Sequence, residues 1–177
     1  MTENRAMVTT AAIPLEQYLS TSYRPDCDYS DGMIEERNAG ERDHSLLQAA
    51  LAACFFARRK EFGLHVFTEQ RLRLNKTRVR IPDVCVTLGP KPPEVVLVSP
   101  PFLCIEILSP EDRMNRIQQR MDDYLRFGVP HVWLIDPQSR RAWRYTTAGN
   151  FEALDGVLRT SEPEIVISLP DLFASVE

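Results

Sequence analysis

The sequence lacks the patterns that identify several common classes of protein. Its four cysteines form no C-x-x-C pair, and the spacing of its three histidines is not that of metal ligands. Scattered cysteines predict reduced thiols, because stable disulfides belong to oxidising compartments. No apolar run approaches the ~20 residues that span a bilayer, and no secretory signal peptide is recognisable. These absences predict a cytoplasmic protein that has no membrane partner.

Motifs that depend on glycine or on an activated nucleophile are missing as well. Only seven of the 177 residues are glycine, and none belongs to a glycine-rich loop of the kind that cradles phosphates. The sequence has neither a nucleophile elbow nor an H-E-x-x-H metal motif. Nucleoside-triphosphate chemistry and serine-hydrolase chemistry therefore have no support.

The composition is that of a globular domain. Hydrophobic residues make up 44% of the chain and charged residues 26%, which is typical of folded proteins. The length suits one domain, since domains average about 150 residues. We expect this domain over 13–177, after a flexible N-terminus over 1–12 in which hydrophobic periodicity is weak.

The net charge of −4 argues at first against a nucleic-acid partner, because proteins that bind nucleic acids are usually basic. The charge is unevenly distributed, however. Six of the 25 acidic residues but only one of the 21 basic residues follow Arg144. The main body is close to neutral, so the net charge does not exclude DNA as a partner.

Hydrophobic periodicity predicts two long helices. The first is expected to be capped by Asp43 and to end at Gly63. The second is expected to begin with Ser109 as its N-cap and Pro110 in its first turn, and to end at Gly128.

Strands are predicted on both sides of these helices. A turn at Asp31-Gly32 leads into one strand, because this dipeptide supplies the positive φ angles of a tight turn. A short helix is expected over 13–19, and strands are expected over 65–68, 71–74, 79–86, 102–108, 131–136, 141–145 and 164–167. This order predicts an α/β domain built on a mixed sheet.

Two carboxylates are the strongest candidates for chemistry. Glu106 interrupts the apolar run over 102–108, and a buried carboxylate is costly without a partner. Asp83 stands at the head of the neighbouring predicted strand, so the two acids form an oxygen-rich site suited to Mg²⁺ or Mn²⁺. The structural alternatives are that Glu106 pairs with an arginine or a helix amide, and that Pro82-Asp83 is an ordinary turn.

Basic residues gather near these acids. Arg113, Arg116 and Arg120 recur along one helix face, which either meets phosphates or is simply solvated. Five bases between residues 71 and 80 alternate with apolar residues and predict a cationic strand face, although surface strands with many ion pairs look similar. These bases are Arg71, Arg73, Lys76, Arg78 and Arg80. His44 is more often a local hydrogen-bonding group than a general base.

An ordered series of motifs resembles the Uma-type restriction endonucleases of the PD-(D/E)XK nuclease superfamily. The series runs from Asp31-Gly32 and His44 to Pro82-Asp83, Glu106-Ile107-Leu108-Ser109-Pro110, Tyr124, Gly128-Val129-Pro130 and Trp133-Leu134-Ile135-Asp136-Pro137. The resemblance covers roughly residues 13–175 and implies a restriction-endonuclease-like core, with a mixed sheet flanked by helices.

The resemblance also implies roles for individual residues. Asp83 and Glu106 would hold Mg²⁺ or Mn²⁺ in a catalytic site for DNA cleavage. The superfamily's lysine is absent at Leu108, and the position that matches a displaced lysine is Arg120. Glu35, His44 and Tyr124 are secondary candidates for the same site. Arg71, Arg73, Arg113 and Arg116 are candidates for DNA contacts.

Three functions remain open at this stage. The first is a metal-dependent DNA endonuclease, which would form a homodimer if two sites cut two strands. The second is a catalytically inactive nuclease-derived module that binds nucleic acid, because arginine replaces lysine at Arg120. The third is a structural protein whose acids only form ion pairs.

Overall fold

The computed structural model describes residues 12–24, 26–37 and 41–177. The largest sheet among the described residues has six strands in the order β10-β9-β8-β7-β6-β3. Its members are β3 (Leu64–Thr68), β6 (Val84–Leu88), β7 (Leu103–Ile107), β8 (His131–Asp136), β9 (Arg141–Thr146) and β10 (Gly149–Glu152). Strands β7 and β8 are parallel and the other neighbours are antiparallel. The prediction of an α/β fold on a mixed sheet is confirmed.

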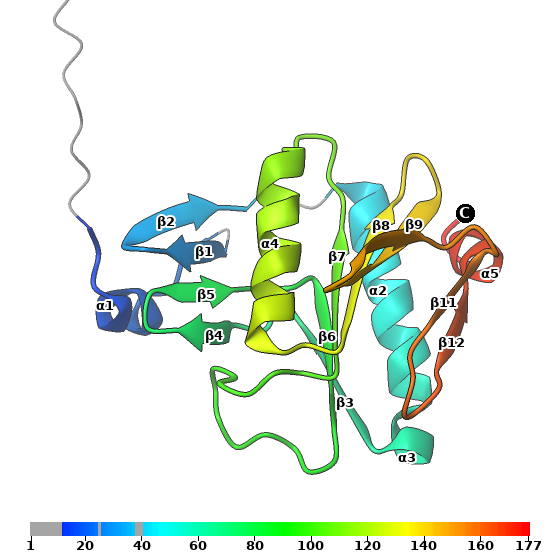
Figure 1. Ribbon diagram of the computed structural model, residues 1–177, viewed down its shortest axis with the longest axis horizontal. Coiled ribbons are helices and arrows are strands. Elements are labelled where there is room, and N and C mark those ends of the chain that lie inside the picture. Colours follow the sequence, from blue (N-terminus) through cyan, green and yellow to red (C-terminus); the bar gives the residue numbers. More distant parts are fainter. Residues whose placement is uncertain (1–11, 25, 38–40) are drawn as a thin grey trace, which may run out of the picture.

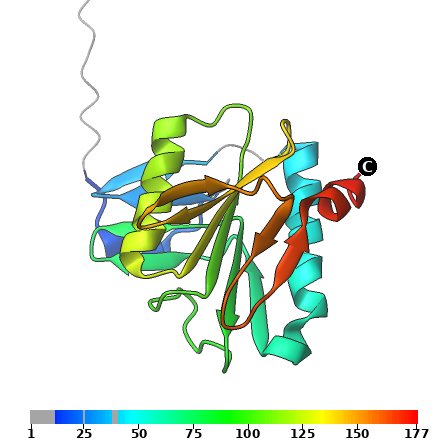
Figure 2. The same ribbon diagram turned by 45° about the vertical axis from the view of Figure 1, so that its right-hand side comes forward.

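Helices cover both faces of this sheet (Figures 1 and 2). On one face, α2 (Arg42–Ala57) packs Leu47, Leu51 and Phe55 into a core that includes Leu103 and Trp133. The short helices α3 (Arg59–Phe62) and α5 (Leu169–Ala174) lie on the same side, as does a small sheet of β11 (Val157–Arg159) and β12 (Val166–Ser168).

The opposite face is covered by α4 (Met114–Phe127). Ile117, Met121 and Tyr124 of this helix pack against a second core that includes Cys104 and Leu134. Gly128 follows the helix with a φ of 99°, a left-handed conformation that glycine adopts without a steric penalty. The predicted end of this helix is therefore confirmed.

A second sheet lies beside α4 and has the order β2-β1-β5-β4. Its strands are β1 (Cys27–Ser30), β2 (Met33–Glu36), β4 (Leu72–Asn75) and β5 (Arg78–Arg80), and α1 (Leu15–Ser20) packs against it. The predicted turn at Asp31-Gly32 is confirmed, with φ angles of 50° and 87°. The first residues of the predicted flexible N-terminus, 1–11, lie outside the described residues.

Several predicted boundaries are wrong; the helix expected to end at Gly63, for example, is divided at Arg58 into α2 and α3. The strand expected over 79–86 is two strands in different sheets, because Pro82 has no amide hydrogen to continue a ladder. Helix α4 begins at Met114 rather than after Ser109, and residues 108–113 form a loop in which the Asp112 carboxylate accepts a hydrogen bond from the Ser109 amide. Asp43 is not a cap: it lies inside α2 and pairs with Arg42, while Glu41 takes the capping position.

Candidate active site

Several parts of the chain converge on a small cavity of about 20 Å³ at one end of the inner strands β6 and β7 of the six-stranded sheet. Asp83 leads into β6, and Glu106 is near the end of the adjacent strand β7. The first turn of α2 brings His44, α4 brings Arg120, and the loop before α4 closes one side. The lining residues are Arg37, His44, Asp83, Glu106, Ile107, Ser109, Asp112 and Arg120.

Asp83 is held by contacts on both of its oxygens. Oδ2 accepts a hydrogen bond of 2.7 Å from the Ile107 amide and lies 3.3 Å from Nε2 of His44. Oδ1 lies 2.6 Å from Nη2 of Arg37. Burial acts to raise the Asp83 pKa, but the His44 hydrogen bond and the Arg37 charge outweigh it and lower the pKa below its ordinary value. Asp83 is therefore a buried, ionised carboxylate.

His44 depends on Asp83 in turn. Burial favours the neutral imidazole, but the hydrogen bond to Asp83 prevails and raises the His44 pKa. Its Nδ1 atom is buried and has no hydrogen-bond partner among the residues that the structure describes. His44 thus orients Asp83, and the imidazole charge is stabilised by that carboxylate.

The surroundings of Glu106 disfavour its ionised form more than those of Asp83 do. The Tyr124 hydroxyl donates to Oε1 at 2.5 Å, and Nη1 of Arg120 lies 3.3 Å from Oε2. Burial, followed by the charge of Asp83, raises the Glu106 pKa to about 7, against the opposing effects of Arg120, Arg37 and Tyr124. Two buried carboxylates so close together repel each other, and a bound cation would relieve that repulsion.

The donor atoms fit a hard divalent cation. Within the described ranges, no three histidine, cysteine or acidic side chains form a closed metal cluster. Mg²⁺, however, commonly binds through only one or two carboxylates and keeps several waters. Asp83 and Glu106 supply that number of carboxylates, and the cavity beside them holds about one water molecule, so most of the ion's waters would lie outside it. These two residues are the ones that would hold the ion.

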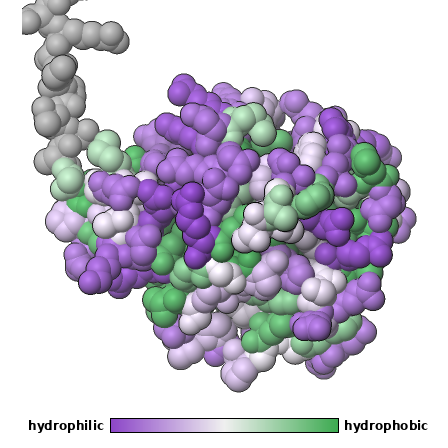
Figure 3. All heavy atoms as spheres, in the orientation of Figure 1, coloured by the Kyte–Doolittle hydropathy of each residue, from purple (hydrophilic) through white to green (hydrophobic). Residues whose placement is uncertain are grey.

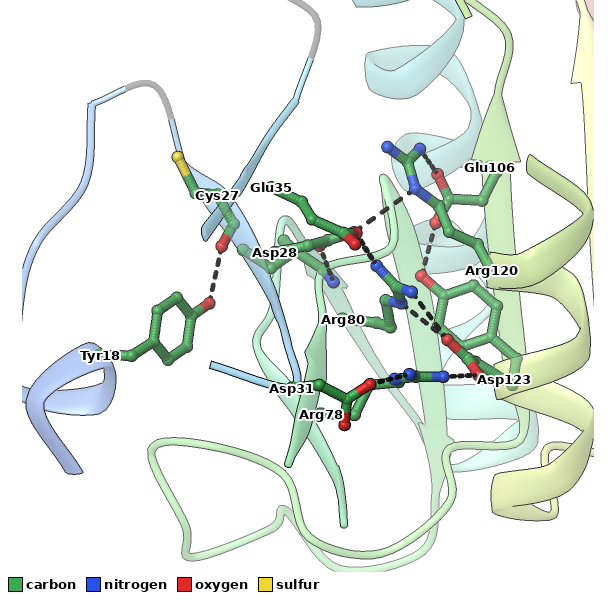
Figure 4. A network of polar contacts seen from close by, with 12 residues as sticks. Tyr18, Cys27, Asp28, Asp31, Glu35, Arg78, Arg80, Glu106, Arg120 and Asp123 are labelled. Carbon is green, nitrogen blue, oxygen red and sulfur yellow. Dashed lines mark hydrogen bonds and ion pairs between the residues drawn. The ribbon is translucent and has the colours of Figure 1, made fainter. Parts of the chain in front are cut away.

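Arg120 links this cavity to a buried network of ion pairs (Figure 4). Its Nε lies 3.4 Å from Oδ2 of Asp28, in addition to its contact with Glu106. Asp28 also pairs with Arg80, which is only 1% exposed and contacts Glu35 and Asp123 as well. The four-stranded sheet and α4 together fix the guanidinium of Arg120 beside Glu106.

The predicted site residues are therefore divided between two places. The cavity is lined by Asp83, Glu106, Arg120 and His44. Tyr124 is not a lining residue, but its hydroxyl donates a hydrogen bond to Glu106. Glu35 lies in the network instead, with Oε2 2.6 Å from Nη1 of Arg80.

The basic residues outside the cavity also differ in their positions. Arg71 donates hydrogen bonds to the Leu19 and Thr21 carbonyls, and Arg73 is half-buried. The continuous cationic face expected over 71–80 is wrong, because Arg78 and Arg80 are neutralised by acids. Arg113 and Arg116 are exposed beside the loop before α4.

Sequence reasoning missed two functional positions. Asp28 is an acid in the fully buried strand β1, but its sequence neighbours Asp26, Ser30 and Asp31 are polar, so no apolar run of the kind that surrounds Glu106 indicated its burial. Arg37 follows β2 and lines the cavity. Nothing in its local sequence distinguishes it from other arginines, since its contact with Asp83 joins residues 46 positions apart.

Comparisons with known proteins give a family and a fold. A family model described as "Uma2: Putative restriction endonuclease" matches residues 15–177. A crystal structure described as a putative nuclease belonging to DUF820 from Anabaena variabilis ATCC 29413 is similar with a TM-score of 0.80 and 23% identity. The match covers 93% of this chain and 99% of the other. At this identity the likeness concerns the fold, and it confirms the predicted restriction-endonuclease-like core.

No curated protein matches the chain. No helix in the described part is both long and apolar enough to cross a membrane.

Proposed function

Because the chain belongs to the Uma2 family of restriction endonucleases, we propose that it is a DNA endonuclease that depends on Mg²⁺ or Mn²⁺. The reaction would be hydrolysis of a phosphodiester bond by an activated water. One observation carries the proposal: the buried carboxylates of Asp83 and Glu106 flank a cavity at the ends of two inner strands, together with two arginines.

The site residues would act in distinct ways. Asp83 and Glu106 would hold the cation, which when bound supplies an acidified water and polarises the phosphate. His44 and the Ile107 amide keep Asp83 in place, and Tyr124 keeps Glu106 in place.

Arg120 supports the reaction by charge rather than by proton transfer. Its guanidinium can stabilise the negative charge that develops on the phosphate. An arginine remains protonated at all ordinary pH values and does not serve readily as a base. The surrounding carboxylates, Glu106 and Asp28, raise the Arg120 pKa further, against the effect of burial. A proton acceptor is thus not among the roles we assign to this residue.

Plasmid nicking tests the proposal. We expect the wild-type protein to nick supercoiled DNA in the presence of Mg²⁺ or Mn²⁺. Nicking should stop when EDTA is added. Glu106→Ala should lower the rate at least about 100-fold, as is typical when a group that organises the reaction is removed. Glu111→Ala is the matched control, since Glu111 is an exposed glutamate in the adjoining loop. Absence of nicking by the wild type, or equal nicking by Glu106→Ala, would contradict the proposal.

An inactive DNA-binding module is the second candidate. It is favoured by the arginine at position 120 and by the apolar Leu108, because the superfamily's lysine is missing from both places. Calorimetry separates the two functions: DNA binding without binding of Mg²⁺ or Mn²⁺ favours the module. Assembly into a homodimer remains a prediction.

A further inference from the structure

Arg37 occupies the place at Asp83 where a cation would be needed. Its side chain is 11% exposed, and its Nη2 atom lies 2.6 Å from Oδ1 of Asp83. The other carboxylate oxygen, Oδ2, has separate contacts with the Ile107 amide and His44. Withdrawal of Arg37 would therefore expose Oδ1 while the carboxylate stays fixed by its Oδ2 contacts.

The charges around the cavity are nearly balanced without any bound ion. Three carboxylates, of Asp83, Glu106 and Asp112, face the guanidinium groups of Arg37 and Arg120 and the imidazole of His44. A divalent cation that entered alone would leave an excess of positive charge in a buried place, which is unfavourable. A phosphodiester carries one negative charge and would reduce that excess.

The two arginines differ in the number of carboxylates that they contact among the described residues. Arg120 contacts both Asp28 and Glu106, and Asp28 is itself anchored by Arg80 and the Ile81 amide. Arg37 has its ion pair with Asp83. Arg37 is thus the guanidinium that can exchange one anion for another, and its planar fork suits a phosphate as well as a carboxylate.

We propose that Arg37 is a substrate-binding residue that leaves Asp83 for a DNA phosphate when the divalent cation binds. This inference rests on the proposed endonuclease function. Its consequence is that cation and phosphodiester bind cooperatively, because each removes a charge that opposes the other. By linkage, the phosphodiester then tightens cation binding by the same factor as the cation tightens phosphodiester binding.

Calorimetric titration with Mn²⁺ alone tests the first half of the inference. Arg37→Gln should bind Mn²⁺ about tenfold more tightly than the wild type, since a competing positive charge has been removed. Arg37→Lys keeps the charge and should bind Mn²⁺ like the wild type. Arg42→Gln is the matched control, because the Arg42 side chain is 84% exposed and pairs with Asp43. A merely structural Arg37 would instead give weaker Mn²⁺ binding in Arg37→Gln.

Repeating the titration with dimethyl phosphate tests the second half. This compound is a phosphodiester monoanion that resists hydrolysis. We expect it to tighten Mn²⁺ binding at least about fivefold in the wild type, within the usual range of coupling between sites, and to have no such effect in Arg37→Gln. Equal Mn²⁺ affinities, equal coupling in both proteins, or no Mn²⁺ binding by either would overturn the inference.

These measurements do not depend on DNA cleavage. If the Mn²⁺ results are as expected and the wild type still fails to nick plasmid, the inference about Arg37 holds and the endonuclease proposal fails. If the wild type nicks plasmid and Arg37→Gln binds Mn²⁺ no more tightly, only the inference about Arg37 fails.

Discussion

Asp83 and Glu106 are equally buried, at 2% exposure each, yet their pKa values move in opposite directions. Asp83 has the imidazole of His44, the guanidinium of Arg37 and a backbone amide as donors, so its pKa falls. Glu106 is buried beside a carboxylate that is already ionised, so its pKa rises. Partners rather than burial decide which of the two acids carries the charge in the empty site.

The raised pKa of Glu106 predicts a pH-dependent stability. The folded protein holds the Glu106 proton up to a pKa of about 7, against an ordinary value of 4.5. This contribution to stability is fully present below pH 4.5 and is lost as the pH rises through 7. Glu106→Gln should therefore match the wild type near pH 4.5 and exceed its unfolding free energy by on the order of 2–3 kcal/mol above pH 7.

Urea unfolding in EDTA from pH 4.5 to 8 measures this difference. The exposed Glu111→Gln variant should follow the wild-type profile. A Glu106→Gln variant that is no more stable than the wild type at pH 8 would contradict the assigned environment of Glu106.

Arg120 gives a second prediction at this scale. Arg120→Lys should keep or raise the nicking rate, because an ammonium group also stabilises charge on the phosphate. Arg120→Ala should lower the rate by about 10- to 100-fold, since the positive charge beside Glu106 is lost. Gel assays of plasmid nicking give the rates. Arg126→Ala is the control, because the Arg126 side chain lies on the same helix and is 72% exposed. Equal rates for wild type, Arg120→Lys and Arg120→Ala would remove Arg120 from the mechanism.

At the scale of elements, the link between the four-stranded sheet and α4 is the main structural feature. Arg80 of β5 contacts Asp28 of β1, Glu35 of β2 and Asp123 of α4. Through Asp28 these elements also hold Arg120. The second sheet therefore contributes to the arrangement of the cavity without lining most of it.

Loss of Arg80 should be strongly destabilising. Arg80→Ala would leave Asp28 and Asp123, which are 1% and 4% exposed, without their main buried counter-ion. Removing one partner of a buried ion pair typically costs about 3–5 kcal/mol, and urea unfolding measures the loss. The Arg126 side chain is 72% exposed, so we expect Arg126→Ala to change the unfolding free energy by less than about 1 kcal/mol. Similar losses of unfolding free energy in Arg80→Ala and Arg126→Ala would contradict the prediction that the buried Arg80 network stabilises the fold more than an exposed arginine does.

Sequence patterns predicted some of these elements correctly and missed others. The apolar runs around Glu106 and after Asp83 located both acids on adjacent strands, because a run of buried residues is a local signal. The strand predicted over 79–86 ran through Pro82, because a proline fits an edge strand or a bulge as well as the strand end that the structure has. Arg37 and the start of α4 were not predictable, because contacts between distant residues determine them.

At the scale of the whole molecule, charge placement matters more than the total of −4. Hydrophilic side chains cover the outward face of α4 in Figure 3, and Arg113 and Arg116 are exposed at its beginning, near the cavity. The bases of β5 are neutralised inside the protein. The arginines at the start of α4 are therefore the better candidates for contacts with the DNA backbone.

These positions predict weak DNA affinity with a strong salt dependence. Each phosphate contact that is lost should reduce the slope of log K against log salt by about one. Arg113→Ala combined with Arg116→Ala should thus reduce the slope by about two, as measured by fluorescence anisotropy. Arg126→Ala, near the other end of α4, should leave the slope unchanged. A wild-type affinity that does not depend on salt would contradict this prediction.

The most direct test of the central claim is anomalous scattering from a crystal soaked in Mn²⁺. We predict a peak in the cavity, with carboxylate oxygens of both Asp83 and Glu106 within ~2.0–2.6 Å of the ion. A crystal in which Mn²⁺ binds elsewhere, or in which these two carboxylates share no ion, would contradict the assignment of the metal-dependent site.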